Sequence, residues 1–220
     1  MDKPVVISIN KLESINRYPE AVNFLSLLFK NAGIRISDSG VEFSCHHHGS
    51  RIKFEQHLDE SKVDYILELD TEQVHTLTEL VTVPKIDDIR KYRILNTLFS
   101  PAIETSVNPF DCLKGITRSN PLLSNSLLRR VLRMENLIHV YIEPPLDEEP
   151  EIGHTLIFAK KEWLIFKGIH GNPGRVFRLT VDDALDFHKH AFIALKSDSK
   201  MRWLTFVRWY LIWRHRVSGG

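Results

Sequence analysis

Residues 62–81 read KVDYILELDTEQVHTLTELV, and this stretch decides the fold class. Its first half alternates apolar and polar side chains, which predicts a strand with one buried face. Its second half changes to helical spacing, and Asp70, followed three residues later by Gln73, has the pattern of an N-terminal capping box. A strand that leads directly into an amphipathic helix is typical of a protein that packs helices on a sheet.

Similar patterns lie before this stretch. Residues 41–47 (VEFSCHH) and 52–58 (IKFEQHL) alternate as strands do, and residues 18–33 have the spacing of an amphipathic helix. The sequence therefore predicts a helix, three strands and a second helix in this part of the chain.

The pattern recurs after a segment rich in proline and glutamate, PPLDEEPEIG. Shifting the first copy by 112 positions places Phe54 on Phe166, Tyr65 on Phe177, Leu67 on Leu179 and Asp70 on Asp182. The four pairs share one register, which predicts an internal repeat. The predicted fold class is α+β, with two related antiparallel β-β-β-α units, a helical middle region and a C-terminal helix.

Three parts follow from this pattern, within what we expect to be one compact domain. Residues 1–83 hold the N-terminal helix and the first unit. Residues 84–137 form a helical connecting region that prolines interrupt, and residues 138–220 hold the second unit with the C-terminal helix.

The amino-acid composition limits the classes of function to be considered. Hydrophobic residues make up 43% of the 220 residues and the net charge is +1, so charge predicts neither a nucleic-acid partner nor an anionic membrane. The two cysteines fit a reducing compartment, no signal peptide is recognisable, and the apolar tract WLTFVRWYLIW is too short to span a bilayer. We expect a soluble cytoplasmic protein without a cofactor.

The stretch SCHHHGSR raises the question of a metal site. If residues 49–50 form a hairpin turn, Cys45 lies opposite Phe54 on the core face. His46 and His48 then lie on the other face beside cations, which oppose a divalent ion, and no metal-ligand spacing elsewhere supplies further ligands. We therefore predict no metal site here.

Two other histidines leave an enzyme hypothesis open. His154 follows the acidic linker, and His188 lies near aspartates on one predicted helix. Either one, with nearby carboxylates, could serve a metal-assisted hydrolase. The alternatives are a solvated linker for His154 and a packed core histidine for His188. No nucleophile motif occurs, so we predict no catalytic residue.

The C-terminal segment KMRWLTFVRWYLIWRHR combines tryptophans with arginines. Such a helix can rest on a membrane surface, with Trp203, Arg208, Trp209 and Trp213 as the contacts. It can also dock on the sheet, with arginine stems covering the edge. We expect docking, because no other long helix follows the second unit to cover it.

The stretch from 40 to 80, with its strand-to-helix passage DYILELDTEQV, resembles the sterol carrier protein 2-like family. The resemblance covers residues 18–81 and, more weakly, 154–195. It implies an α+β fold with an apolar cavity that binds lipids or acyl chains without chemistry.

These observations give the predicted function, which is non-enzymatic binding of an apolar ligand or lipid between sheet and helices. The expected cavity walls are the aromatic residues of the inward strand faces: Phe43, Phe54, Tyr65, Phe166 and Phe177. The hydrolase and an interaction module built on the C-terminal helix are the alternatives.

Overall fold

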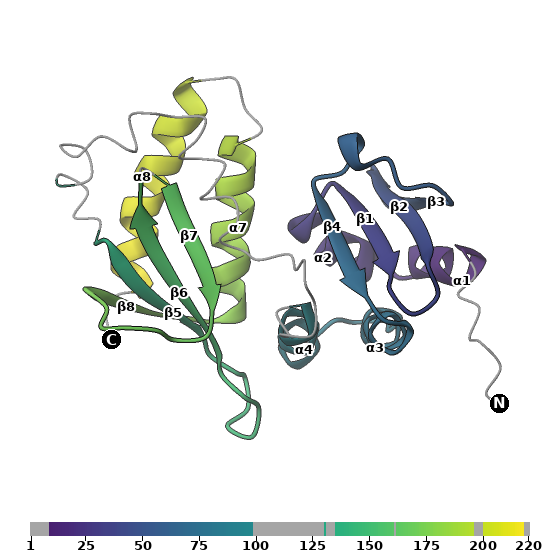
Figure 1. The fold of residues 1–220 in the computed structure, drawn as a ribbon, viewed down its shortest axis with the longest axis horizontal. Coiled ribbons are helices and arrows are strands. Elements are labelled where there is room, and N and C mark those ends of the chain that lie inside the picture. Colours follow the sequence, from purple (N-terminus) through teal and green to yellow (C-terminus); the bar gives the residue numbers. More distant parts are fainter. Residues whose placement is uncertain (1–8, 99–129, 131–134, 161, 196–199, 218–220) are drawn as a thin grey trace. The chain divides into compact units, whose positions relative to one another are not determined.

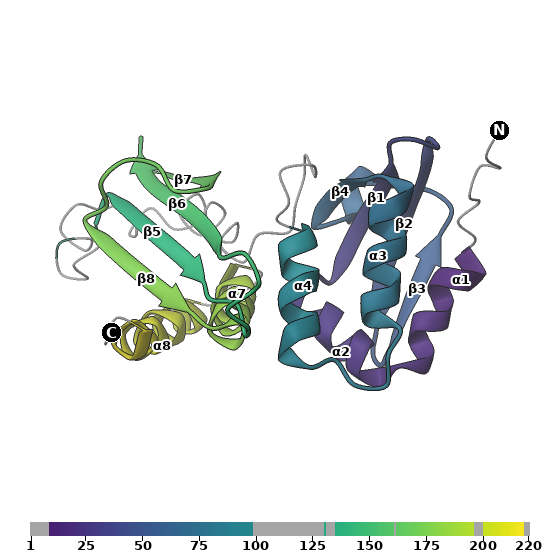
Figure 2. The same cartoon turned by 90° about the horizontal axis from the view of Figure 1, so that it is seen from below.

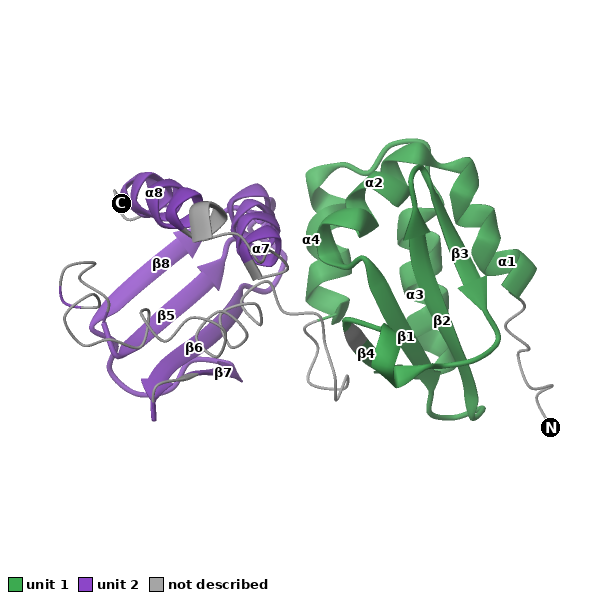
Figure 3. Cartoon of the chain, turned by 90° about the horizontal axis from the view of Figure 1, so that it is seen from above, with its two compact units in different colours: residues 1–108 green, residues 109–220 purple. Residues whose placement is uncertain are grey.

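A computed structural model describes residues 9–98, 130, 135–160, 162–195 and 200–217. The chain divides into two compact units, residues 1–108 and 109–220, where we had expected one compact domain (Figure 3). The helix at Asp88–Leu98 belongs to unit 1 and not to a connecting region. Most of the rest of the expected connecting region, residues 99–129 and 131–134, lies outside the described residues.

Unit 1 is a four-stranded sheet with helices on one face (Figures 1 and 2). Its elements are α1 (Ile9–Glu13), the 3-10 helix η1 (Ser14–Arg17), α2 (Pro19–Leu28), β1 (Asn31–Ile36), β2 (Val41–His48), β3 (Arg51–Glu55), the 3-10 helix η2 (Glu60–Lys62), β4 (Tyr65–Leu69), α3 (Thr71–Val81) and α4 (Asp88–Leu98). The strand order is β3-β2-β1-β4, and β4 runs parallel to β1 while the other pairs are antiparallel. The expectation of a wholly antiparallel unit is therefore wrong, since the sheet is mixed.

Unit 2 has the same arrangement. Its described elements are β5 (Leu137–Ile142), β6 (Ile152–Ala159), β7 (Glu162–Lys167), β8 (Arg175–Leu179), α7 (Val181–Leu195) and α8 (Lys200–Val217). The strand order is β7-β6-β5-β8, again with the last strand parallel to the first. The helices α7 and α8 lie side by side on one face of this sheet (Figure 2). Unit 1 thus has four strands where the sequence suggested three.

The strand that the sequence analysis missed is β1. The helix expected over residues 18–33 ends at Leu28, and Ala32 and Gly33 belong to β1 instead. Ala32 continues the helical spacing of Leu25 and Leu28, so helical spacing and strand alternation overlap there. Because β1 lies between β2 and β4, this short segment is the centre of the sheet.

The two units correspond position by position through their backbone hydrogen bonds. Ser37 N–H donates to the Leu69 carbonyl at 2.9 Å, and Glu143 N–H donates to the Leu179 carbonyl at 2.8 Å. The strand registers extend this correspondence. They match Ile36 with Ile142, Val41 with Ile152, Cys45 with Leu156, Phe54 with Ile165 and Leu69 with Leu179.

These registers differ by one or two positions from the pairs that a shift of 112 residues gives. Phe54 corresponds to Ile165 and not to Phe166, and Leu67 corresponds to Phe177. The connections between strands differ in length in the two units, so no single shift can align them. Origin of the two units by duplication stays a prediction.

Both units start the first helix after the sheet in the same way. The Asp70 carboxylate accepts from Gln73 N–H at 2.7 Å, and the Gln73 side chain accepts from Asp70 N–H at 2.9 Å. In unit 2 the Thr180 hydroxyl accepts from Asp183 N–H at 3.1 Å, and the Asp183 carboxylate accepts from Thr180 N–H at 3.3 Å. The capping box predicted at Asp70 is confirmed, and its counterpart is Thr180 and not Asp182.

The N-terminal helices of unit 1 close the exposed edge of its sheet. Asn16 in η1 donates its side-chain N–H to the Ile52 carbonyl at 2.8 Å and accepts from Ile52 N–H at 2.7 Å. These two bonds satisfy backbone groups of the edge strand β3 that would otherwise face water or another chain. They also hold Leu12 and Ile15 over the sheet, where both are buried.

The C-terminal helix α8 docks on α7 and β8. Phe187 of α7 contacts Trp213 at 5.1 Å and Phe206 at 6.3 Å between ring centroids, and Trp209 stacks on His190 at 4.1 Å. Trp209 also contacts Phe187 and so belongs to the docked side of α8, whereas Leu204 is exposed. Within the described residues, no helix is long and apolar enough to cross a membrane.

We predict that Trp213→Ala destabilises unit 2 by about 3–5 kcal/mol, the cost of removing a buried aromatic side chain. Trp213 is 4% exposed, whereas its neighbour Ile212 is 66% exposed. Ile212→Ala is therefore the matched control and should change stability by less than about 0.5 kcal/mol. Urea unfolding measures both, and equal effects of the two substitutions would contradict the docked helix.

Candidate functional site

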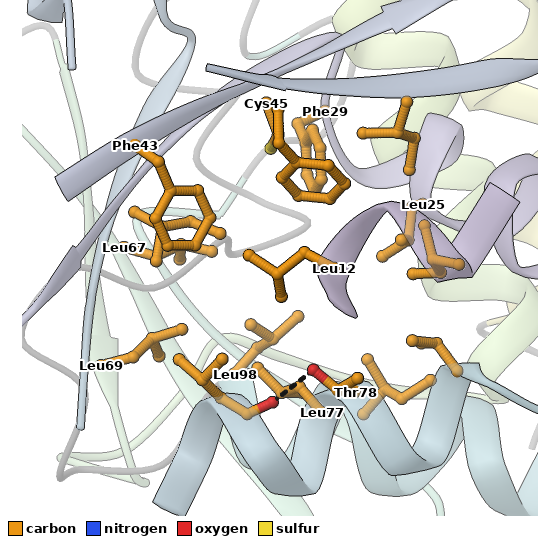
Figure 4. Close-up of a pocket in the computed structure, with 17 residues that line it drawn as sticks. Leu12, Leu25, Phe29, Phe43, Cys45, Leu67, Leu69, Leu77, Thr78 and Leu98 are labelled. Carbon is orange, nitrogen blue, oxygen red and sulfur yellow. Dashed lines mark hydrogen bonds between the residues drawn. The ribbon is translucent and has the colours of Figure 1, made fainter. Parts of the chain in front are cut away.

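Unit 1 contains an apolar cavity of about 90 Å³ between its sheet and its helices (Figure 4). The sheet, the N-terminal helices and the two later helices all contribute to its wall. The lining residues are Leu12, Ile15, Leu25, Phe29, Ile34, Phe43, Cys45, Ile52, Phe54, Leu67, Leu69, Val74, Leu77, Thr78, Val81, Ile94 and Leu98. A cavity with so many apolar contributors from separate elements is the strongest candidate for a binding site in the described residues.

The cavity wall has almost no polar side chain that could bind a polar group of a ligand. Thr78 is the one lining residue with a hydroxyl group, and that hydroxyl donates to the Val74 carbonyl at 2.7 Å, one turn earlier in α3. Cys45 also lies in the wall, and burial raises the pKa of its thiol to about 12. The thiol is therefore neutral and a poor nucleophile at physiological pH. The site can select a ligand by size and apolar character, and it has no reacting group.

The five predicted wall residues do not meet in one place. Phe43 and Phe54 line the cavity and contact each other at 6.0 Å between ring centroids. Tyr65 lies on β4, but its side chain is outside the described part of the structure. Phe166 and Phe177 belong to unit 2, where Phe166 is exposed and Phe177 is buried against Trp213.

The sequence analysis missed the helical half of the cavity. Leu77 of α3, Ile94 of α4 and Leu25 of α2 belong to the apolar stripes of their helices. Periodicity identifies such stripes, but it does not show which of their residues leave a gap between them. No signal in the sequence distinguishes a cavity wall from a filled core at these positions.

The three adjacent histidines have three different environments. His48 is exposed and His47 faces the helices, where its ring contacts Phe29 at 5.5 Å. Burial lowers the pKa of His47. His46 is half-buried, and its Nδ1 lies 3.0 Å from the Asn31 side-chain oxygen, so it is less exposed than expected. The hairpin register that placed these side chains is confirmed, with His48 opposite Arg51.

The candidate catalytic histidines are both buried in unit 2. His154 lies on β6 and faces the helices, and burial, with a smaller effect of Lys167, lowers its pKa to about 4. His188 of α7 is fully buried and stacks near Phe192 at 5.9 Å. Within the described residues, no three His, Cys, Asp or Glu side chains lie close enough to hold a metal ion.

The residues proposed for membrane contact do not all face solvent, since Trp213 is buried. Trp209 and Trp213 contact α7, and Arg208 is exposed. The side chain of Trp203 lies outside the described part of the structure. Among the α8 side chains that the structure describes, the large exposed apolar ones are Leu204 and Ile212.

Comparison of the chain with protein-family models, with curated proteins and with solved structures finds no significant match.

We predict that the stability of unit 2 falls by about 2 kcal/mol between pH 7 and pH 5 because of His154. Its folded pKa of about 4 lies below the ordinary histidine value, so the unfolded chain binds the proton first as the pH falls. The stability contribution is complete above the unfolded pKa and is lost as the pH falls toward the folded pKa. Urea unfolding of unit 2, followed by tryptophan fluorescence, measures this change.

His154→Phe should remove this part of the pH dependence. Phe43 occupies the corresponding position in unit 1, so an aromatic side chain is compatible with this site. If the stability of wild type and variant fell equally between pH 7 and pH 5, the pH dependence could not be assigned to His154.

Proposed function

We propose that unit 1 binds a small apolar ligand, or the end of an acyl chain, in the cavity between its sheet and its helices. The observation that carries this proposal is the cavity itself, which is lined by apolar side chains from strands and helices. The resemblance of residues 18–81 to the sterol carrier protein 2-like family supports the same class of ligand.

The volume limits the size of the ligand. A cavity of about 150 Å³ lined by Leu, Ile and Phe holds benzene in an engineered protein, so apolar cavities of this order bind small molecules. The cavity in unit 1, at about 90 Å³, is smaller. It accommodates a short aliphatic end and not a whole lipid, so a longer ligand must extend out of it or move a helix.

The wall chemistry limits the kind of ligand. A buried polar group without a hydrogen-bond partner costs free energy, and the one hydroxyl in the cavity wall, that of Thr78, already donates to the Val74 carbonyl. The polar end of any ligand must therefore lie outside the cavity. Binding by the apolar end alone gives affinity that rises with buried apolar area, until the volume is filled.

The test uses alkanoic acids of increasing chain length, from butanoic to decanoic acid, with binding followed by methyl NMR and calorimetry. Leu77 of α3 lies in the cavity wall and is half-buried. We expect Leu77→Phe to fill the cavity and weaken binding at least about tenfold, equivalent to about 1.4 kcal/mol. Leu77→Ala enlarges the cavity and should shift the preference toward longer chains.

Leu80→Phe is the matched control, because Leu80 lies on the same helix but does not line the cavity. It should leave binding unchanged. The proposal is wrong if none of these acids perturbs the methyl groups of the cavity, or if Leu80→Phe reduces binding as much as Leu77→Phe does.

A further inference from the structure

The imidazole of His47 has unused hydrogen-bonding capacity in unit 1. The side chain as a whole is half-buried, but both ring nitrogens are buried and neither has a hydrogen-bond partner among the described residues. The adjacent histidines differ from it, because His46 Nδ1 lies 3.0 Å from the Asn31 side-chain oxygen and His48 is exposed to water. Buried polar groups in folded proteins are nearly always hydrogen-bonded, so an exception requires an explanation.

The His47 side chain stands next to the apolar cavity. Phe43, Cys45 and His47 alternate along β2 on the face that packs against the helices, and the first two line the cavity. Ile52 of β3 stands directly opposite His47 and also lines the cavity. Two residues along a strand span about 7 Å, so the imidazole begins where the Cys45 part of the wall ends.

One aromatic ring separates this imidazole from the cavity. Phe29 lies in the cavity wall together with Cys45 (Figure 4). Its ring is 5.5 Å from the His47 ring between centroids, at an angle of 53°. Phe29 follows the last residue of α2 and has an extended backbone, so the preceding helical turn does not restrict its side chain as it would inside the helix. A change of rotamer at Phe29 is the smallest movement that brings a ligand in the cavity to the imidazole.

Unit 2 shows that the fold does not require a histidine at this position. By register, Phe158 of β6 stands where unit 1 has His47, and Trp163 of β7 stands where it has Ile52. The rings of Phe158 and Trp163 contact each other at 5.3 Å between centroids. An apolar ring thus fills the corresponding place, and packing alone does not explain the imidazole in unit 1.

The surroundings of His47 favour a neutral ligand group. Burial lowers the pKa of His47, so the ring is neutral at physiological pH, and burial equally opposes a charged partner. A neutral imidazole has one N–H donor and one nitrogen acceptor. A hydroxyl group also donates and accepts, whereas a carboxylate is charged and only accepts. The hydroxyl group of an alcohol therefore matches this site better than the carboxylate of an acid.

We propose that unit 1 binds a short aliphatic alcohol, with its chain in the apolar cavity and its hydroxyl group hydrogen-bonded to the His47 imidazole. This inference rests on the proposed function, since the cavity must hold the chain. It adds a polar partner at the edge of a wall that is otherwise apolar. The hydrogen bond compensates for the removal of the hydroxyl group from water, so His47 selects an alcohol over an apolar molecule of the same size.

Two ligands of matched size test the role of His47. In n-pentyl chloride a chlorine atom replaces the hydroxyl group of n-pentanol, so the chain is kept and the hydrogen-bonding group is lost. His47→Phe is the variant, because Phe158 occupies the corresponding position in unit 2. We expect this substitution to lower the affinity for the alcohol relative to the chloride at least about fivefold, the effect of one hydrogen bond. Calorimetry measures both affinities, and circular dichroism shows that the variant is folded.

His48→Phe is the matched control, since it makes the same change at the exposed neighbour. It should leave the ratio of the two affinities unchanged. A second measurement needs no variant. The NMR shifts of the His47 ring nitrogens in the wild-type chain should change on addition of n-pentanol and stay nearly constant with n-pentyl chloride. The ring nitrogens of His48 should respond to neither ligand.

The outcomes separate this inference from the proposed function. If neither ligand binds the wild-type chain, the cavity does not hold an aliphatic chain, and both proposals are wrong. If both ligands bind but His47→Phe leaves the ratio of affinities unchanged, the cavity binds the chain and the role of His47 is overturned. The same conclusion follows if bound n-pentanol leaves the His47 ring nitrogens unperturbed, or if His48→Phe lowers the ratio as much as His47→Phe does.

Discussion

The parallel pairing of the first and fourth strands constrains each unit of this protein. Antiparallel neighbours can be joined by a short turn, but a parallel partner requires the chain to cross the sheet before it returns. In both units the segment after the third strand makes this crossing. A buried hydroxyl holds it in place, since Ser44 donates to the His57 carbonyl at 2.7 Å and Thr155 donates to the Gly168 carbonyl at 2.8 Å. This crossing determines which face of the sheet packs against the helices and which face is turned away from them. It also determines where the next helix begins.

Local sequence patterns correctly predicted those features of the fold that depend on neighbouring residues alone. The hairpin at Gly49 and Ser50 gave its register correctly, because a two-residue turn leaves one pairing, and the capping box fixed the start of α3 at Asp70. The parallel partner of β1 could not be found in this way. Alternation shows which side chains share a face, but it does not show which strand lies beside which. The wrong sheet type has this cause, whereas β1 was missed because its first residues continue the helical spacing of α2.

The candidate site was predictable to the same extent. Phe43 and Phe54 were identified because they alternate on strands whose inward face is evident from the sequence. Phe166 was placed in the wall by the shifted alignment, and its true position on the opposite face follows from a register that differs by one residue. In a strand, an error of one residue exchanges the two faces completely. The cavity itself depends on how helices from distant parts of the chain fill space, which no local pattern records.

Cys45 gives unit 1 a built-in indicator of its internal motions. The thiol is buried in the cavity wall, and its pKa of about 12 leaves almost no thiolate at neutral pH. A thiol reagent can therefore react only during openings that bring water to β2, and the rate of reaction measures how often these occur. A molecule held in the cavity makes such openings rarer in proportion to its occupancy. The thiol in the cavity wall thus provides a kinetic record of the site, without any label added to the protein.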